Sequence, residues 1–495
     1  MQEILVPSYV GEAKPAANFE PLFAKVSDDE LLSYGVPAEW LADVRAATED
    51  SLLTLADHLP GEAAEALLEL ATGGKPRVPQ PVTAKASPFD HPDAQRRFRV
   101  MSNVEELERA LEFPWDKWTV FDVETGALEP FAELLLPAAV QYAWANSRRT
   151  HLYAACSDGE PPPGPVGSLH RLVALRIDPK SGALSMESRQ ATLPGRTVHM
   201  TLDATDRHAV VAFNNPPGVT VHALVADGTL EKESGEAQQV DCGHYPHQIR
   251  VSPSNKRVIV VSRGTRPSAT SKGTPGALMV SSFANGSLKT HASIAPDGGV
   301  HFGARHLDFH PSRPWAYVGL ELQNKLHMFG MEGDEFTPQP LFARDTLPAG
   351  TFITPRQVVG TVHVHPNGKY VYVVNRCNGS EPFEGRPFYS GGDNSMAVYA
   401  INQSTGEPTL IQNEDTRGLH TRTFSIDPGG RLLVAAHISG LEVRDADSIG
   451  THFVAGGLSA FRVQDDGKLA FLRRLEVETD RHNRLWWSKL FRIGE

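Results

Sequence analysis

The sequence predicts an all-β fold, a seven-bladed β-propeller with an incomplete first blade, preceded by a small α-helical segment. Two observations lead to this prediction. After about residue 120, short runs rich in valine, tyrosine and leucine follow a period of two and are separated by glycine and proline turns, which is typical of antiparallel strands. A strand, turn, strand unit then recurs at intervals of 49 to 62 residues. Four strands in such an interval are typical of one propeller blade, whose faces are buried against its neighbours.

The composition argues against several classes of protein. A formal charge of −12 argues against general affinity for nucleic acid or anionic membrane surfaces, because both would repel the average surface. Cys156, Cys242 and Cys377 are widely spaced without a CxxC motif, so neither a disulfide framework nor a zinc site is indicated. No stretch has eighteen apolar residues, and the N-terminus has no basic flank before an apolar run. We therefore predict a cytoplasmic protein without metal or other cofactor, and no feature indicates an oligomeric state.

Residues 1–112 are predicted to form an α-helical accessory segment with a proline-rich linker over 75–92, and residues 113–495 the propeller. Ser27 and Glu30 form a capping box at the start of one helix, "EAAEALLELATGG" is amphipathic, and "SNVEELERALEF" predicts a further helix from about Ser102. The stretches "DDELLSYGVPAEWLADVRAATEDSLLTLADHLP" and "RRFRVMSNVEELERALEFPWDKWTVF" resemble the connector of helicase-like proteins, in which a toxin-like domain precedes a superfamily I motor. Helicase activity is not implied, because the chain lacks the glycine-rich phosphate-binding motif.

Two hairpins in each repeat can be followed along the propeller. The first recurs in six copies, which are "ANSRRTHLYAA" at 145, "DATDRHAVVAF" at 203, "SPSNKRVIVVS" at 252, "HPSRPWAYVGL" at 310, "HPNGKYVYVVN" at 365 and "DPGGRLLVAAH" at 427. The second follows most copies at turns such as "KSGAL" at 180 and "DDGKL" at 465. For the remaining blade, which is the incomplete first blade along the chain, "WTVFDVETGALEPFAELLL" predicts outer strands and the C-terminal "RLWWSKLF" predicts the inner strand. One strand of this blade is then either missing or supplied by the N-terminal segment.

Alignment of the six copies on their turn residues shows an unexpected break in the apolar pattern. Four residues before the turn every copy is apolar, as Ala143, Met200, Ile249, Leu307, Val362 and Phe424. Six residues before it, where alternation predicts another apolar position, the set is Gln141, Val198, His247, Arg305, Gly360 and Arg422. Ten residues after it, at the end of the second strand, the set is Ser157, Asn214, Arg263, Glu321, Arg376 and Ile438. In a hairpin centred on the turn these two sets face each other, so Arg305 and Glu321 are predicted cross-strand neighbours, and so are His247 and Arg263.

Four arginines, Arg263, Arg305, Arg376 and Arg422, are thus expected at one mouth of the central channel, with His247 and Glu321. A single Arg/Glu pair can be a simple rim salt bridge worth about 0 to 1 kcal/mol. Surplus like charge at a channel mouth, however, costs free energy unless an anion occupies it. We therefore predict an anion-binding site at this mouth.

The other histidines fall into two groups. His306 and His363, with His199 and His420, are expected near the same rim and could support the site. His310 and His365 lie in the turns beside proline and are expected to be structural. No HxH or HxxxH group accompanies carboxylates at a ligand-like spacing, so no metal site is predicted.

The motifs "GARHLDFHP" followed by "ELQNKLHMF", "TVHVHPNGKYVYVVNR" and "LHTRTFSIDPGGRLLVAAH" carry a family resemblance over about residues 119 to 480. They resemble the 6-phosphogluconolactonase family of seven-bladed propeller lactonases, whose relatives include the fungal carboxymuconate lactonizing enzymes. The resemblance implies that the family's arginine and following glutamate are Arg305 and Glu321, its histidine is His247, and a further arginine is Arg376.

Two features depart from the family pattern. Many relatives have an acidic residue near the end of the second strand of the histidine blade, whereas this sequence has Arg263 there. The loops "NGSEPFEGRPFYSGGDNS" and "RDADSIGTHFVAGG" are also long. The phosphorylated sugar lactone is therefore not transferred to this chain as its substrate.

The leading hypothesis is hydrolysis of a small anionic or polyhydroxylated lactone, such as a sugar acid lactone of the 6-phosphogluconolactone type. Arg305 and Arg376 would hold the anionic group and polarise the carbonyl, while Glu321 or His247 would take a proton from the attacking water. Additional substrate contacts are expected from a set comprising Arg263, Arg422, His306 and His363. The alternatives are a lactone-forming enzyme acting on a muconate and a non-catalytic propeller that serves as a binding platform.

Overall fold

A computed structural model of the protein describes residues 3–5, most of 21–71, residues 115–122, most of 127–477 and residues 485–492. The chain forms two compact units, one made of Met1–Glu12 with Pro114–Glu495 and the other of Ala13–Phe113. The proline-rich linker expected over 75–92 and the helix expected from Ser102 lie outside the described residues.

The smaller unit is helical over its described part. Its helices are α1 (Asp28–Ser33), the short 3₁₀ helix η1 (Ala38–Trp40), α2 (Leu41–Ala46) and α4 (Gly61–Ala71). The predicted N-cap is confirmed, because the Ser27 hydroxyl accepts a hydrogen bond of 3.2 Å from the backbone N–H of Glu30. Phe23, Leu31 and Val44 are buried together in its core. None of the helices among the described residues is long and apolar enough to cross a membrane.

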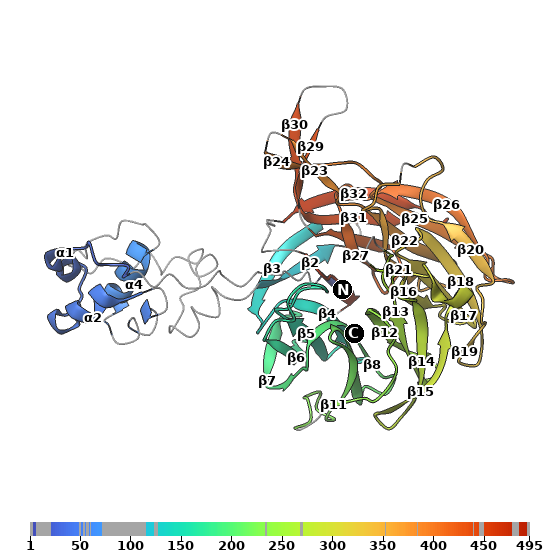
Figure 1. The fold of residues 1–495 in the computed structure, drawn as a ribbon, viewed down its shortest axis with the longest axis horizontal. Helices are drawn as coiled ribbons and strands as arrows, with labels where there is room; N and C mark the ends of the chain where they lie inside the picture. Colours follow the sequence, from blue (N-terminus) through green and yellow to red (C-terminus); the bar gives the residue numbers. More distant parts are fainter. Residues whose placement is uncertain are drawn as a thin grey trace. The chain divides into compact units, whose positions relative to one another are not determined.

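The larger unit is a ring of seven antiparallel sheets, which confirms the predicted fold (Figure 1). We number the blades in chain order from the first complete repeat and give each from the inner to the outer strand. The first blade consists of β4 (Val140–Ala145), β5 (His151–Ser157), β6 (His170–Ile177) and β7 (Leu184–Thr192). The second consists of β8 (Arg196–Leu202), β9 (His208–Asn215), β10 (Pro217–Ala223) and β11 (Glu236–Ala237). The third consists of β12 (Pro246–Val251), β13 (Arg257–Ser262), β14 (Ala277–Ala284) and β15 (Ser287–Ile294). The fourth blade consists of β16 (Ala304–Phe309), β17 (Trp315–Leu320) and β18 (Lys325–Glu332), and both β19 (Glu335–Phe336) and β20 (Phe342–Asp345) pair with β18. The fifth consists of β21 (Val358–Val364), β22 (Tyr370–Arg376), β25 (Ser395–Ile401) and β26 (Pro408–Asp415). The sixth consists of β27 (Thr421–Ile426), β28 (Leu432–His437), β31 (Gly457–Val463) and β32 (Leu469–Glu476).

The seventh, closing blade takes strands from both ends of the chain. From the inner to the outer strand, its order is β33 (Leu490–Arg492), β1 (Glu3–Leu5), β2 (Trp115–Asp122) and β3 (Ala127–Leu135). Ile4 pairs with Val120 on one side and with Phe491 on the other. The predicted C-terminal inner strand is thus confirmed, and the strand without a source comes from the start of the chain. Glu3–Leu5 is therefore a strand of the closing blade, although it lies within residues 1–112, which were expected to form the accessory segment.

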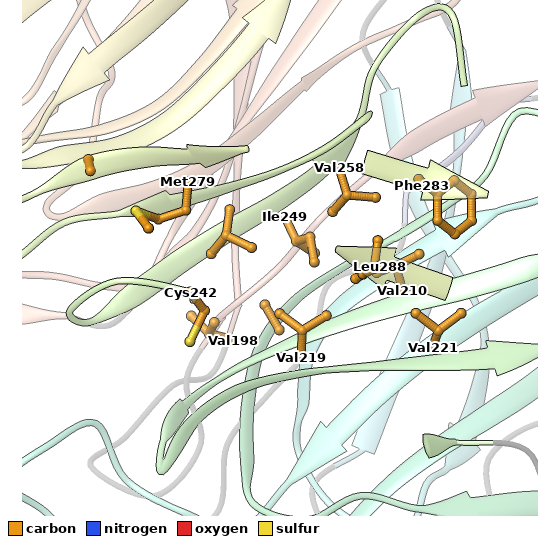
Figure 2. Packing of buried hydrophobic residues seen from close by; sticks show 13 residues of the cluster. Val198, Val210, Val219, Val221, Cys242, Ile249, Val258, Met279, Phe283 and Leu288 are labelled. Atoms are coloured by element: carbon orange, nitrogen blue, oxygen red, sulfur yellow. The ribbon is translucent and has the colours of Figure 1, made fainter. Parts of the chain in front are cut away.

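Adjacent blades are held together by apolar side chains that interdigitate between their faces. Figure 2 shows one such contact, in which Val198, Val210 and Val219 of the second blade pack against Ile249 and Val258 of the third. The six apolar positions found by aligning the repeats are all 3% exposed or less. Burial of these branched side chains is the main force that keeps the ring closed.

Polar contacts at the turns repeat from blade to blade. The hydroxyl of Tyr317 in the fourth blade donates to the carbonyl of Gly406 in the fifth at 2.8 Å, and Tyr372 makes the same contact with Gly467 of the sixth. His310 Nε2 lies 2.8 Å from the carbonyl oxygen of Gly368, one blade further on. These contacts fix each blade relative to the next.

The two long loops identified in the sequence fold together into an additional four-stranded sheet, which we call the accessory sheet (Figure 1). It contains β23 (Ser380–Phe383) and β24 (Arg386–Tyr389) from the fifth blade, and β29 (Leu441–Arg444) and β30 (Thr451–Val454) from the sixth. Phe388 and Glu442 join the two hairpins through a parallel bridge. Each hairpin is inserted after the second strand of its blade.

Candidate active site

The six inner strands from β4 to β27 are each interrupted by a β-bulge near the strand start. The pairing register shifts there, and some inner-strand residues have no cross-strand partner in the ladder. They are Gln141, Val198, His247, Arg305, Gly360 with Thr361, and Arg422. This is the set at which apolar alternation breaks in the sequence. A bulge leaves one residue outside the ladder and redirects its side chain, so the bulges explain why polar residues occupy this position.

The bulges also change the predicted pairing. In the fourth blade Ala304 pairs with Leu320 and His306 pairs with Gly319, which leaves Arg305 between them. Arg305 and Glu321 are therefore not a cross-strand pair, and the prediction was wrong on this point. The prediction counted residue pairs outward from the turn and assumed an unbroken ladder, so it did not allow for the extra residue that the bulge inserts into the inner strand. The two side chains nevertheless meet, with Arg305 Nε 2.9 Å from Glu321 Oε2.

The same correction applies to His247 and Arg263. His247 occupies a bulge between Pro246 and Gln248, and the Arg263 N–H donates to the carbonyl of Tyr245. The Arg263 guanidinium stacks on the Tyr245 ring at 3.9 Å and reaches across to the next blade, where its Nη1 lies 2.8 Å from Glu321 Oε1.

Glu321 is the centre of the site. It is 6% exposed, and its carboxylate contacts three arginines from three blades, because Arg376 Nη2 lies 3.4 Å from Oε2 in addition to the two contacts above. Although burial opposes ionisation, the guanidinium groups of Arg263, Arg376 and Arg305 hold the pKa of Glu321 at about 2. The carboxylate is therefore ionised at neutral pH, and both of its oxygens are already engaged.

One carboxylate does not balance the positive charge of this site. No carboxylate in the described part of the chain forms an ion pair with Arg422, which lies 4.2 Å over the ring of Trp486. Arg305 is 1% exposed, and its Nη1 has no hydrogen-bond partner within the described residues. Burial first, and then the charge of Arg376, lower the pKa of Arg305 to about 9. Buried cations in such excess make a site complementary to an anion.

Three histidines extend from the arginines into the channel. The rings of His247 and His306 are 5.3 Å apart between centroids, and those of His306 and His199 are 5.6 Å apart. Burial and then the charge of Arg305 hold the pKa of His247 well below its usual range. His247 is therefore neutral at pH 7, and its buried Nδ1 has no hydrogen-bond partner among the residues that the structure describes.

The pocket formed by these groups is narrow. Its empty volume is about 250 Å³, and its walls are made by Gln141, Tyr142, Val198, His247, Arg305, His306, Thr361, Arg422, Thr423, Trp486 and Trp487. We call it the arginine pocket. The two tryptophans come from the C-terminal segment that also supplies β33, so the sequence that closes the ring also covers part of the site.

His363 lies apart from the arginine cluster. Its Nδ1 is 3.5 Å from Oδ2 of Asp308, which also binds Arg250 Nη1 at 2.9 Å, and it does not line the arginine pocket. The structure thus brings His247, Arg263, Arg305, Glu321, Arg376, Arg422 and His306 to one site and places His363 in a second polar layer.

Sequence reasoning missed Arg196. This side chain is 1% exposed and donates to Gln141 Oε1 at 2.8 Å, to Asn214 Oδ1 at 2.9 Å and to the carbonyl of Gly159 at 3.0 Å. Both Gln141 and Asn214 appeared in the aligned polar sets, so two unexplained polar residues in adjacent blades were the available signal. Among the described residues, no group of three or more His, Cys, Asp or Glu side chains is arranged to hold a metal ion.

Comparison with known proteins identifies relatives of this architecture. A family model described as lactonase, 7-bladed beta-propeller, matches residues 117–444. The 6-phosphogluconolactonase of Bacillus subtilis strain 168 is 26% identical over 306 residues, which cover 60% of this chain and 76% of that protein. The 6-phosphogluconolactonase of Pectobacterium atrosepticum is 26% identical over 303 residues, which cover 61% and 78%.

Among solved structures, the periplasmic gluconolactonase of Pseudomonas aeruginosa superposes with a TM-score of 0.55 at 19% identity, covering 77% of this chain and 95% of that one. A Bacteroides fragilis structure described as a putative 6-phosphogluconolactonase gives a TM-score of 0.52 at 17% identity, covering 76% and 92%. At such low identity these structures establish the shared fold.

Proposed function

Because the chain belongs to the lactonase family of seven-bladed β-propellers, we propose that it hydrolyses a small lactone that carries an anionic group or several hydroxyls. The observation that carries this proposal is a buried excess of arginine around one carboxylate, with a neutral histidine in the same pocket. The proteins named 6-phosphogluconolactonase among its relatives support the lactone as the substrate class.

Arg305 and Arg422 bind the substrate in this proposal. Both line the arginine pocket, and Arg305 has an unpartnered buried Nη1. A guanidinium there polarises the lactone carbonyl and stabilises the oxyanion that forms when water attacks. Arg376 and Arg263 add positive charge that favours a carboxylate or phosphate on the substrate.

His247 is the general base. Glu321 is unsuited to this role, because its pKa of about 2 makes it a weak proton acceptor and its oxygens are occupied by arginines. A substrate anion would offset the arginine charges that depress the pKa of His247, so binding would bring the imidazole closer to the pKa of an effective base. Glu321 instead positions the three arginines.

The reaction balances with water alone. His247 accepts a proton as the water oxygen attacks the lactone carbonyl. The ring C–O bond then breaks, and the proton returns to the departing alkoxide. The product is a hydroxy acid, which ionises to a carboxylate at neutral pH.

The test is a pH-indicator assay of proton release from gluconolactone and from 6-phosphogluconolactone, corrected for spontaneous hydrolysis. We expect turnover of at least one of them, at least a hundredfold loss of kcat in His247→Ala, and a comparable loss of kcat/KM in Arg305→Ala. Losses below about tenfold in both variants would contradict the assigned roles. Loss of diene absorbance from a muconate would instead indicate lactone formation, and a chain inert to all of these would be a binding platform.

A further inference from the structure

A second, larger cavity lies beneath the accessory sheet. Its empty volume, which includes the space open to solvent at its mouth, is about 990 Å³. One wall is the accessory sheet, through Val443 and Val454, and the opposite wall comes from the outer edge of the fifth blade, through Asp415. We call it the accessory pocket. The propeller repeat does not require either hairpin that encloses it.

The lining of the accessory pocket combines an apolar side with a polar side. Tyr389, Val443 and Val454 supply aromatic and aliphatic surface, whereas Asp393 and Asp415 supply carboxylates. A pyranose has the matching character, since its ring faces are apolar and its edges carry hydroxyls that donate hydrogen bonds to carboxylate and amide oxygens. Arg417 also lines this pocket, with its Nη1 3.8 Å from Asp415 Oδ2, so positive and negative side chains face each other there and suit a neutral group rich in hydroxyls.

The polar side is held in place before any ligand binds. The side-chain oxygen of Asn394 accepts hydrogen bonds from the N–H groups of Cys377 at 3.0 Å and His420 at 2.8 Å, and its amide donates to the Tyr389 hydroxyl at 2.8 Å. The Asp393 N–H donates to Gln357 Oε1 at 2.7 Å. Preorganised groups of this kind lose little entropy on binding.

The accessory pocket and the arginine pocket share one stretch of chain. Leu419 lines the first and Arg422 lines the second, and three residues span at most about 11 Å between Cα atoms. His420, between them, has its Nε2 2.9 Å from Arg376 Nη1. Arg417 and His420 both have left-handed backbone conformations, with φ of 62° and 53°. Residues other than glycine adopt this conformation only at a cost in free energy.

We propose that the accessory pocket binds the glycosyl extension of a larger substrate, so that the physiological substrate is the lactone of an oligosaccharide acid. This inference rests on the proposed function. The arginine pocket is much the narrower of the two, with an empty volume of about 250 Å³, so a glycosyl group attached to a lactone ring bound there must lie outside it. A glycosyl group attached to that ring extends toward Leu419 and lies between the accessory sheet and the fifth blade.

The test compares a disaccharide aldonolactone, cellobionolactone, with gluconolactone. For the unmodified protein we expect kcat/KM to be at least about tenfold higher for the disaccharide lactone, because contacts remote from the reacting bond contribute to transition-state binding. Val443→Trp fills the accessory pocket without removing a hydrogen-bonding side chain. It should abolish this preference and leave gluconolactone kinetics within about twofold. Val225→Trp is the matched control, at a valine that is 37% exposed on the second blade. It should leave kcat/KM unchanged for both substrates.

Direct binding separates this inference from the proposed lactonase activity. Cellobiose contains no lactone, and calorimetric titration should show that it binds the unmodified protein and Val225→Trp but not Val443→Trp. Saccharide binding blocked by Val443→Trp, in a protein that hydrolyses no lactone, would support the accessory pocket and contradict the activity. Lactone hydrolysis without a disaccharide preference and without saccharide binding would overturn the accessory pocket alone.

Discussion

The two ends of the inner strands use histidine in opposite ways. At the turn end, His310 Nε2 contacts the carbonyl of Gly368, and its Nδ1 accepts from the N–H groups of Ser312 and Arg313. At the bulge end, His247 and His306 each have a buried Nδ1 without a hydrogen-bond partner among the described residues. Buried polar atoms are normally paired, because an unpaired one costs about 1–3 kcal/mol. At these positions, the pairing of the ring nitrogens separates His310, which holds two blades together, from His247 and His306, each of which keeps a nitrogen available to a ligand.

Removal of the central carboxylate should produce the largest change at the bulge end. Glu321→Ala leaves Arg263, Arg305 and Arg376 buried without their counter-ion, and we expect the free energy of unfolding to fall by about 3–5 kcal/mol. Added phosphate should restore part of this loss by binding between the arginines. Denaturant unfolding with and without phosphate measures both effects.

Glu335→Ala provides the control for this variant. Glu335 also contacts two basic side chains, Arg257 at 2.9 Å and His291 at 2.8 Å, but its side chain is 49% exposed. A loss of no more than about 1 kcal/mol is expected there. Equal losses in the two variants would show that burial does not distinguish the sites.

Replacement of one histidine at each end of the inner strands by alanine tests directly whether the two ends use histidine differently. His247→Ala should lower kcat at least a hundredfold and change the free energy of unfolding by less than about 1 kcal/mol, because its Nδ1 leaves no partner unsatisfied. His310→Ala should do the reverse, with an unfolding free energy lower by about 1–3 kcal/mol and an unchanged kcat, since the carbonyl of Gly368 loses its partner. A His310→Ala variant with activity reduced as strongly as His247→Ala would remove the distinction between the two ends.

The pH dependence should show a smaller effect. The pKa values of His247 and His306 are lowered by burial in the folded chain, so the unfolded chain binds more protons below pH 6.5 and stability falls as the pH drops below that value. The pKa of Glu321 is lowered from 4.5 to about 2, so a second loss of stability is expected as the pH falls from about 4.5 to about 2. For activity, kcat/KM should stay level from pH 8 to well below pH 6.5, because burial and the charge of Arg305 hold the pKa of His247 in the free protein well below that value. Unfolding curves from pH 8 to 3 check the first statement, and initial rates check the second. A stability that rises on acidification from pH 6.5 to 5 would contradict the burial of neutral histidines.

The sequence was sufficient to predict the ring and most residues of the candidate site, for a simple reason. A repeated blade places equivalent positions at equivalent heights in the channel, so a polar residue at an aligned apolar position marks the site without any knowledge of three-dimensional contacts. His247, Arg305 and Arg422 were found in this way. The actual register could not be obtained, because a bulge is favoured by packing and by neighbouring strands and does not change the apolar pattern on its turn side.

Other features depended on contacts that no local pattern records. His363 was expected near the arginines, but two further residues along β21 place it beside Asp308. Glu3–Leu5 is too short to show strand periodicity, and only its pairing with Thr119–Phe121 and Leu490–Arg492 makes it a strand. The accessory sheet joins loops about 60 residues apart, so each loop alone was recognised only as long.

In chain order, the helical unit is an insertion between β1 and β2, two neighbouring strands of the closing blade. Leu5 lies opposite Thr119 on neighbouring strands, so the whole stretch between them is, topologically, an enlarged hairpin loop. Excision of that loop with a short turn in its place should leave the ring fastened. Deletion of everything before residue 114 would instead remove the strand that joins the start of the propeller sequence to its end.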